Sequence, residues 1–227
     1  MICSALEVPT LSEYESKQFL AGAGIQTPPE RLVHSPDEAV AAARELGFPI
    51  ALKLCGAGIA HKTERDGVRL GLGDAATVSG QATGLLERLR PEDGSAGLLV
   101  QRMVGGRREL IAGLVRDPAF GPCVMFGIGG ILAEVLGDVA FAVAPLDERD
   151  ASQLVDALEH QNLLGAFRGE PAADRAKLAA LLQALGQIGL ERPEVRSIDL
   201  NPLILEGPDP VVVDALVEIE TDPGDGR

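Results

Sequence analysis

Acidic and amide side chains occur in two neighbouring apolar stretches near the end of the chain. Asp199 and Asn201 alternate at the end of the apolar run 195–200, so in a strand their side chains point to the same side. Asp214 follows in the next apolar run, 211–216. Oxygen donors from adjacent strand ends, completed by substrate phosphates, form the coordination that Mg²⁺ favours. These residues therefore predict a metal site, although ordinary turn residues are the alternative.

A second group of candidate residues is basic and lies in the first third of the chain. Lys53 stands between Leu52 and Leu54, so in a strand it takes the face opposite these leucines. Such a lysine is either a solvated surface residue or a cation directed into a cleft at a phosphate. His61 and Lys62 follow in a polar loop over 56–67. They are either a pair that engages a phosphoryl group or unremarkable loop residues.

Two glycine-bearing segments offer further candidates. The segment 56–61 begins like a dinucleotide-binding fingerprint, but His61 replaces the third glycine and no helix is predicted to follow, so we reject a Rossmann unit. Gly127-Ile128-Gly129-Gly130 lies between two apolar stretches. Its backbone N–H groups could approach an anion closely, or the segment could be a tight turn between strands. Glu134 follows in an apolar setting and faces either the cleft or water.

Capping and turn patterns predict the elements that would position these residues. Serines at 12 and 35, each followed three residues later by glutamate, are capping boxes that predict helices over 12–23 and 35–46. Further helices are predicted over 74–90, 147–159 and 172–189, and strands over 50–54, 68–72, 98–103, 109–115, 123–126, 139–144, 195–200 and 211–216. A loop that ends at Gly97 separates two α/β blocks, which predicts two lobes with a ligand cleft between them.

The composition excludes several classes of partner. The 227 residues carry 20 basic and 34 acidic side chains, a net charge of −14, which argues against nucleic acid and anionic membranes. No apolar run approaches about 18 residues, so no membrane span is predicted. Three widely spaced cysteines and the lack of a signal-peptide pattern favour the cytoplasm. Lys53 and Lys62 are two of only four lysines, which indicates a local anion site, and the lack of tryptophan predicts aliphatic walls for any flat ligand.

Taken together and in order, these residues resemble a known family over residues 11–217. The chain looks like the ATP-grasp β subunit, or β domain, of the ADP-forming acyl-CoA synthetases (acetate–CoA ligase, ADP-forming), which are relatives of succinyl-CoA synthetase. The segments that carry the resemblance are 11–15 (Leu-Ser-Glu-Tyr-Glu), 53–54, 61–63 (His-Lys-Thr), 100–104, 108–111, 121–130, 168–169 and 199–203 (Asp-Leu-Asn-Pro-Leu).

The resemblance implies an ATP-grasp fold of the α/β (α+β) class. Residues 1–97 and 98–219 would form two α/β lobes with the nucleotide cleft between them, and residues 220–227 a flexible tail. Residues 100–104 would be the interlobe hinge that holds adenine through backbone groups, which adds Gln101, Arg102, Met103 and Val104 to the expected site.

The resemblance also assigns expected roles to the candidates for chemistry. Lys53 would contact the nucleotide phosphates, Glu109 would lie near the ribose or phosphates, and the glycine loop with Gly129 and Gly130 would line the phosphate end. Asn201 and Asp214 would hold Mg²⁺, with Asp199 beside them. The implied cofactors are therefore ATP or ADP and Mg²⁺.

His61 matches the histidine that is thought, in this family, to take a phosphoryl group from the partner subunit and pass it to ADP. The implied reaction is acyl-CoA + ADP + phosphate ⇌ carboxylate + CoA + ATP. Because the chain has no recognisable CoA-binding unit, an α partner with the CoA and acyl site is expected, in an α2β2 hetero-oligomer. The starting Met1 and the extent of the resemblance favour a free subunit over a domain of a fused chain.

Two positions depart from the family pattern, and two other functions remain open. Ser197 stands where the family often has glutamate, and Asp66 stands where a glycine is usual. One alternative is another ATP-grasp ligase, which joins a carboxylate to an amine through an acyl phosphate and does not need His61. The other is a non-catalytic nucleotide-binding or regulatory module, against which the joint presence of Lys53, His61, Asn201 and Asp214 argues.

Overall fold

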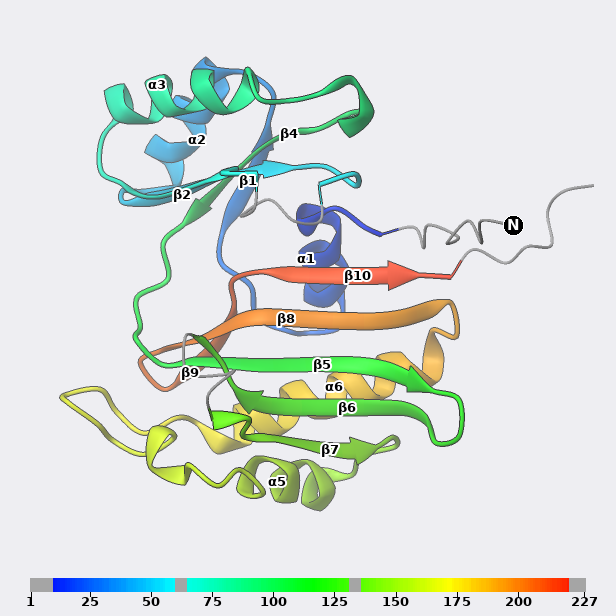
Figure 1. Ribbon diagram of the computed structural model, residues 1–227. Coiled ribbons are helices and arrows are strands. Elements are labelled where there is room, and N and C mark those ends of the chain that lie inside the picture. Colours follow the sequence, from blue (N-terminus) through cyan, green and yellow to red (C-terminus); the bar gives the residue numbers. More distant parts are fainter. Residues whose placement is uncertain (1–9, 60–64, 131–135, 221–227) are drawn as a thin grey trace, which may run out of the picture.

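Two antiparallel sheets form the framework of the protein (Figure 1). A computed structural model describes residues 10–59, 65–130 and 136–220. The first sheet has the strand order β1-β4-β2-β3, with β1 at Glu30–Val33, β2 at Ile50–Cys55, β3 at Val68–Leu72 and β4 at Gly97–Arg102. The second has the order β10-β8-β5-β6-β7, with β9 also paired to β8. Its strands are β5 at Glu109–Asp117, β6 at Gly121–Ile128, β7 at Val139–Val143, β8 at Val195–Glu206, β9 at Asp209–Val212 and β10 at Ala215–Ile219.

Two helices cover one face of the first sheet, α2 at Pro36–Leu46 and α3 at Ala75–Leu86 (Figure 1). Both begin where a side chain accepts a hydrogen bond from the first turn, at Ser35 and at Asp74. A short 3₁₀ turn at Pro91–Asp93 leads into β4. After β2 the chain returns as the antiparallel neighbour β3 rather than through a crossover helix to a parallel strand, which agrees with our rejection of a dinucleotide-binding unit.

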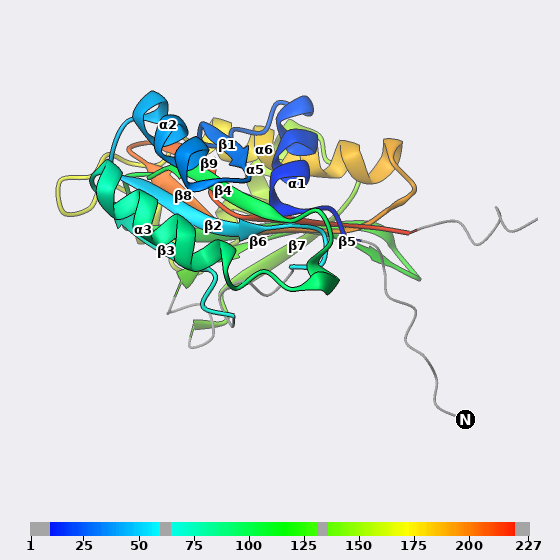
Figure 2. The same ribbon diagram turned by 90° about the horizontal axis from the view of Figure 1, so that it is seen from above.

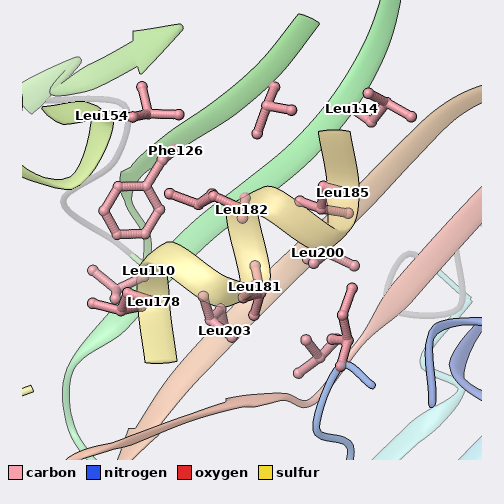
Figure 3. Close-up of a cluster of buried hydrophobic side chains, with 14 of the residues drawn as sticks. Leu110, Leu114, Phe126, Leu154, Leu178, Leu181, Leu182, Leu185, Leu200 and Leu203 are labelled. Atoms are coloured by element: carbon pink, nitrogen blue, oxygen red, sulfur yellow. The ribbon is translucent and has the colours of Figure 1, made fainter. Parts of the chain in front are cut away.

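Among the described residues, helices cover one face of the second sheet and leave the other face free of helices. Helices α5 at Glu148–Asp156 and α6 at Arg175–Glu191, with a 3₁₀ turn at Gln161–Leu163 between them, pack on the covered face. Figure 3 shows leucines of α6 directed at Leu110, Phe126 and Leu200 of the sheet. Because side chains alternate along a strand, Glu109 and Gly113 of β5 belong to the opposite face. No helix in the described part of the chain is long and apolar enough to cross a membrane.

Helix α1, at Glu13–Gly22, comes first in the chain and lies between the two sheets (Figures 1 and 2). The predicted capping box is confirmed, since Ser12 and Glu15 each accept a hydrogen bond from the other's backbone N–H. Leu20 packs in the same apolar cluster as α6, and the Ser16 hydroxyl accepts a hydrogen bond from Val217 of β10. The lobe boundary at residue 97 stays a prediction, but α1 packs with the second core although it precedes the first sheet in sequence.

Two predicted strands differ from those observed, at the places where the candidate acidic residues lie. Strand β8 continues to Glu206, so Asp199 and Asn201 lie in its middle and not at its end. The single strand predicted over 211–216 is divided into β9 and β10, and Asp214 lies in the break between them. Pro202 of β8 lies opposite this break and has no N–H to donate, so the ladder of hydrogen bonds is interrupted here. The carbonyl of Pro202 still accepts a hydrogen bond from the N–H of Val213.

Candidate functional site

The three predicted metal-binding side chains lie together in one pocket. Asp199, Asn201 and Asp214 line a cavity of about 160 Å³, with Glu13 of α1 and the turn at Gly56 on its other side. The backbone ties the two acidic segments to each other, because the N–H of Asn201 donates to the carbonyl of Asp214 at 3.2 Å. This pocket therefore joins the helix-free face of the second sheet to the end of β2 in the first.

The donor set of this pocket fits a hard divalent cation. Two carboxylates and an amide oxygen are the ligand types that Mg²⁺ takes, with water and phosphate oxygens completing its shell. Partial burial, and then the negative charge of Asp214, raise the pKa of Asp199, although part of Asp199 stays open to solvent. A cation would relieve this repulsion. Among the described residues, no group of three or more His, Cys, Asp or Glu side chains is placed to hold a metal, so protein carboxylates alone do not complete a site.

Lys53 lies next to the pocket, inside a buried ion-pair network. Its side chain is only 5% exposed, and its ammonium is 2.6 Å from an oxygen of Glu13 and 3.1 Å from the carbonyl oxygen of Val213. It is therefore not a solvated surface lysine, which was one of the two interpretations of the strand pattern. Val213 directly precedes Asp214, so Lys53 of the first sheet contacts the same segment that supplies an acidic side chain to the pocket.

The predicted hinge connects the two sheets, but several of its polar groups are engaged within the protein. Gln101 is buried in β4 and its side-chain oxygen accepts a hydrogen bond from Lys17. The backbone N–H groups of Arg102 and Met103 donate to the carbonyls of Pro29 and Pro49. The side chain of Val104 is buried. None of these four residues lines the acidic pocket. Because the side-chain oxygen of Gln101 and the N–H groups of Arg102 and Met103 are already engaged, an adenine contact at the hinge would use other backbone groups.

A carboxylate at the end of β8 holds the hinge in place, and the sequence patterns did not indicate it. Glu206 accepts hydrogen bonds from both terminal nitrogens of Arg102, at 2.9 and 3.2 Å, and from the N–H of Gly105 at 2.9 Å. Because Glu206 belongs to the second sheet and Arg102 to the first, this two-point contact sets how the chain passes from one sheet to the other.

Glu109, Gly129 and Gly130 lie together in a second, larger pocket of about 370 Å³. Arg168, which belongs to a segment of the family resemblance, also lines it. Gly129 is required by its close approach to the backbone of β5, whereas Gly130 is favoured by its positive φ of 71°. A Cβ atom at Gly129 would lie 2.8 Å from the backbone of Leu110, and one at Gly130 would lie 2.9 Å from the Glu109 carboxylate. The glycines thus have structural reasons, backbone packing at Gly129 and backbone conformation at Gly130, that do not depend on a ligand.

Arg108 fixes the loop that closes this second pocket. Its buried guanidinium donates to the Glu170 carboxylate and to four backbone carbonyls, those of Leu163, Gly165, Pro171 and Gly207. A planar group with five donors suits this arrangement, and a lysine could not reproduce it. Arg108 therefore holds the segment 163–171 beside Glu109.

His61 and Lys62 lie outside the described residues, as does Glu134. The first described residues after that segment are anchored, because Arg65 makes a two-point contact with Asp93 at 2.6 and 2.8 Å. Sequence analysis also gave no role to Glu13 or Lys17, which lie in the buried network with Lys53. The sequence holds one signal for them, because Glu13 and Lys17 share a helical face with the apolar Leu20. That face is the one buried in the structure.

Comparison with known proteins identifies the family. A family model described as an ATP-grasp domain matches residues 4–219. The β subunit of acetate–CoA ligase (ADP-forming) I from Pyrococcus furiosus is 34% identical over 208 residues, which cover 90% of this chain and 90% of that one.

Two solved structures of acetyl-coenzyme A synthetase 1 from Ca. Korarchaeum cryptofilum are also similar, each at 38% identity. One, with coenzyme A and Ca-AMPCP, has a TM-score of 0.86 and covers 93% of this chain and 94% of its own. The other, with coenzyme A and Mg-AMPPCP and its phosphohistidine segment pointing towards the nucleotide binding site, has a TM-score of 0.81 and covers 93% of both. The predicted fold and family are therefore confirmed: this chain belongs to the ATP-grasp domain family, as a relative of the β subunits of ADP-forming acetate–CoA ligases.

Proposed function

We propose that this chain is the nucleotide-binding β subunit of an ADP-forming acyl-CoA synthetase. The overall reaction is acyl-CoA + ADP + phosphate ⇌ carboxylate + CoA + ATP, and the step on this chain moves a phosphoryl group between a histidine and ADP. The observation that carries the proposal is the acidic pocket, in which Asp199, Asn201 and Asp214 meet Glu13 and the turn after β2. Relatives of similar length with this activity support the same assignment.

The proposed nucleotide site extends along the helix-free face of the second sheet. Gly113 of β5 lies opposite Asp199. Glu109 lies on the same face of β5, four residues from Gly113, which corresponds to about 13 Å at the rise per residue of a strand. That separation is comparable with the length of an extended nucleoside diphosphate. We therefore assign the phosphates to the acidic pocket, with Lys53 beside them, and the ribose to the neighbourhood of Glu109 and the hinge.

Mg²⁺ would be held by Asp199, Asn201 and Asp214, and would neutralise charge on the phosphates during transfer. Lys53 adds positive charge from the first sheet next to the same phosphates. Asp199, whose pKa is raised by partial burial and by Asp214, would be held in its ionised form by the cation.

His61 is the proposed phosphoryl carrier. A neutral imidazole nitrogen of His61 attacks the phosphorus, the bond from phosphorus to the histidine nitrogen expected on the α partner breaks, and that nitrogen keeps the electron pair. In the second half of the step, a terminal oxygen of ADP attacks the same phosphorus and the nitrogen–phosphorus bond breaks, which restores the imidazole and forms ATP. The incoming phosphoryl group would come from an α partner that carries the CoA and acyl site.

The test is transfer of phosphate from [γ-³²P]ATP to this chain in the presence of Mg²⁺. We expect acid-labile, base-stable label on the wild type, as histidine phosphoramidates have, and none on His61→Ala. The His61→Ala variant should still bind ADP. His34→Ala is the matched control, because His34 is exposed at the end of β1, and it should label like the wild type.

Two outcomes would contradict the proposal. Normal labelling of His61→Ala, or normal ATP formation by that variant with the partner present, would remove His61 from the reaction. Binding of Mg·ADP without label on any histidine, and without turnover when the partner is added, would favour a ligase that works through an acyl phosphate or a regulatory nucleotide-binding module.

A further inference from the structure

Lys17 is a buried lysine at the junction of the two sheets. Its side chain has no exposed surface. The ammonium is 2.8 Å from Glu13 and 2.9 Å from the side-chain oxygen of Gln101, and it also contacts the Glu30 carboxylate. One side chain of α1 thus contacts β1 and β4 of the first sheet.

The same ammonium also contacts the segment that precedes the metal ligand. The carbonyl oxygen of Val213 lies 3.3 Å from Nζ of Lys17 and 3.1 Å from Nζ of Lys53. On the other side of this peptide, the N–H of Val213 donates to Pro202 and the carbonyl of Asp214 accepts from Asn201. The two ammonium groups and the two backbone bonds together fix the peptide that leads into Asp214.

The charges balance among the described members of this network. Lys17 and Lys53 face Glu13 and Glu30, and all four side chains are at least 95% buried. Burial raises the pKa of Glu30, and the positive charge of Lys17 opposes that effect. Removing one charge from such a group leaves its partner buried without compensation. The network therefore behaves as one unit. A test has to separate its contribution to the stability of the fold from its effect on the proposed metal–nucleotide site.

We infer that Lys17 is a positioning residue for the metal–nucleotide site. The inference rests on the proposed function, since it takes Asp214 to be a ligand of the cation that accompanies the nucleotide. The ammonium of Lys17 contacts neither the Asp214 nor the Asn201 side chain. It acts through the Val213 carbonyl, which sets the position of Asp214 relative to Asn201. Its contacts with Glu13 and Gln101 tie that position to the first sheet. Its effect should therefore be on cation-dependent nucleotide binding rather than on nucleotide binding alone.

The test compares Lys17→Met with a charge-balanced double variant, Lys17→Met with Glu30→Gln. The double variant removes one cation and one anion together, so it should recover most of the thermal stability lost in the single variant. ADP binding is measured by calorimetry without metal and over a series of Mg²⁺ concentrations, and Mn²⁺ binding in the presence of ADP by electron paramagnetic resonance. Lys177→Met is the matched control, because this exposed lysine of α6 pairs with Asp209 away from the site.

We expect both Lys17 variants to bind ADP in the absence of metal as tightly as the wild type does. They should need about 10- to 100-fold more Mg²⁺ to reach the same increase in ADP affinity, as is usual when the support of a metal ligand is lost. The Lys177 control should match the wild type. A double variant that regains stability and also shows wild-type dependence on Mg²⁺ would overturn the inference, because Lys17 would then serve the fold only.

The outcomes also separate this inference from the proposed function. A wild type that binds Mg·ADP but never forms phosphohistidine refutes the phosphoryl-transfer proposal, while the comparison of Mg²⁺ dependence still decides the role of Lys17. A wild type whose ADP binding gains nothing from Mg²⁺ refutes the positioning role directly.

Discussion

Asp93 offers a quantitative test of how the chain is anchored just after the segment that contains His61. Its carboxylate is buried and makes a two-point contact with Arg65, and it accepts a further hydrogen bond from the N–H of Arg90. The hydrogen bond from Arg65, with that from Arg90, lowers the pKa of Asp93 from 3.8 to about 2. Arg65 thereby fixes one end of the loop between β2 and β3.

The perturbation is Asp93→Asn, and its expected size follows from the pKa. A carboxylate whose pKa is lower in the folded state stabilises the fold at neutral pH, and this stabilisation is lost as pH falls from about 4 through about 2. A folded-state pKa of about 2 against 3.8 corresponds to about 2 kcal/mol at pH 7, of which about half remains near pH 3. For a chain of this length, that loss lowers Tm by about 4–8 °C.

The assay is urea unfolding of wild type and Asp93→Asn at a series of pH values from 7 to 3. The free-energy gap between the two proteins should be widest at neutral pH and should narrow below pH 4. Glu92→Gln is the control in the same turn, because the ion pair of Glu92 with Arg90 is exposed at 3.8 Å and is worth little. A gap at pH 7 no larger than that of the control, or one that does not change with pH, would refute this reasoning.

Two further predictions concern the pockets. Arg108→Lys should lower the free energy of unfolding by about 2 kcal/mol, since a lysine loses at least two of the five hydrogen bonds. The control Arg107→Lys, at an exposed arginine, should change it by less than about 0.5 kcal/mol. Equal free energies of unfolding for the two variants, measured in urea, would contradict this prediction. Asp199→Asn should raise Tm in metal-free buffer at pH 7, because burial and then the charge of Asp214 raise the pKa of Asp199, so that the fold loses stability as pH rises through that pKa. The gain in Tm should shrink toward acid pH, and a variant no more stable than the wild type would count against a cost of holding this partly buried carboxylate beside Asp214.

Local chemistry made much of the fold predictable from the sequence. The capping pattern at Ser12 and Glu15 is present as expected, and helices α1 and α2 begin within one residue of the predicted starts. Alternation also succeeded on β8, where Asp199 and Asn201 take the same face, as predicted, and line one pocket. These signals act over a few residues, so they are legible without knowledge of the partner strands.

The position of Asp214 could not be predicted in the same way. The apolar run 211–216 has the composition of one strand, and nothing local marks a break after Val212. The break depends on long-range partners: Pro202 opposite it cannot donate a hydrogen bond, and the carbonyl of Val213 faces two lysines from distant segments. Lys17 was missed for a related reason, since a Glu13–Lys17 pair one helical turn apart is usually a solvated surface pair.

The charge at the junction explains how so acidic a chain can take an anionic nucleotide. Lys17 and Lys53 each already contact a glutamate in the described structure, so the buried network as a whole contributes no net positive charge. Asp199 and Asp214 add two carboxylates to the pocket beside it. A polyphosphate that enters here meets more negative than positive charge from these groups. The further positive charge that favours binding has to come from groups outside this set, and the proposed cation between the carboxylates and the phosphates would supply part of it. The position of Asp214, and of the lysines that fix it, should therefore govern Mg²⁺-dependent nucleotide affinity.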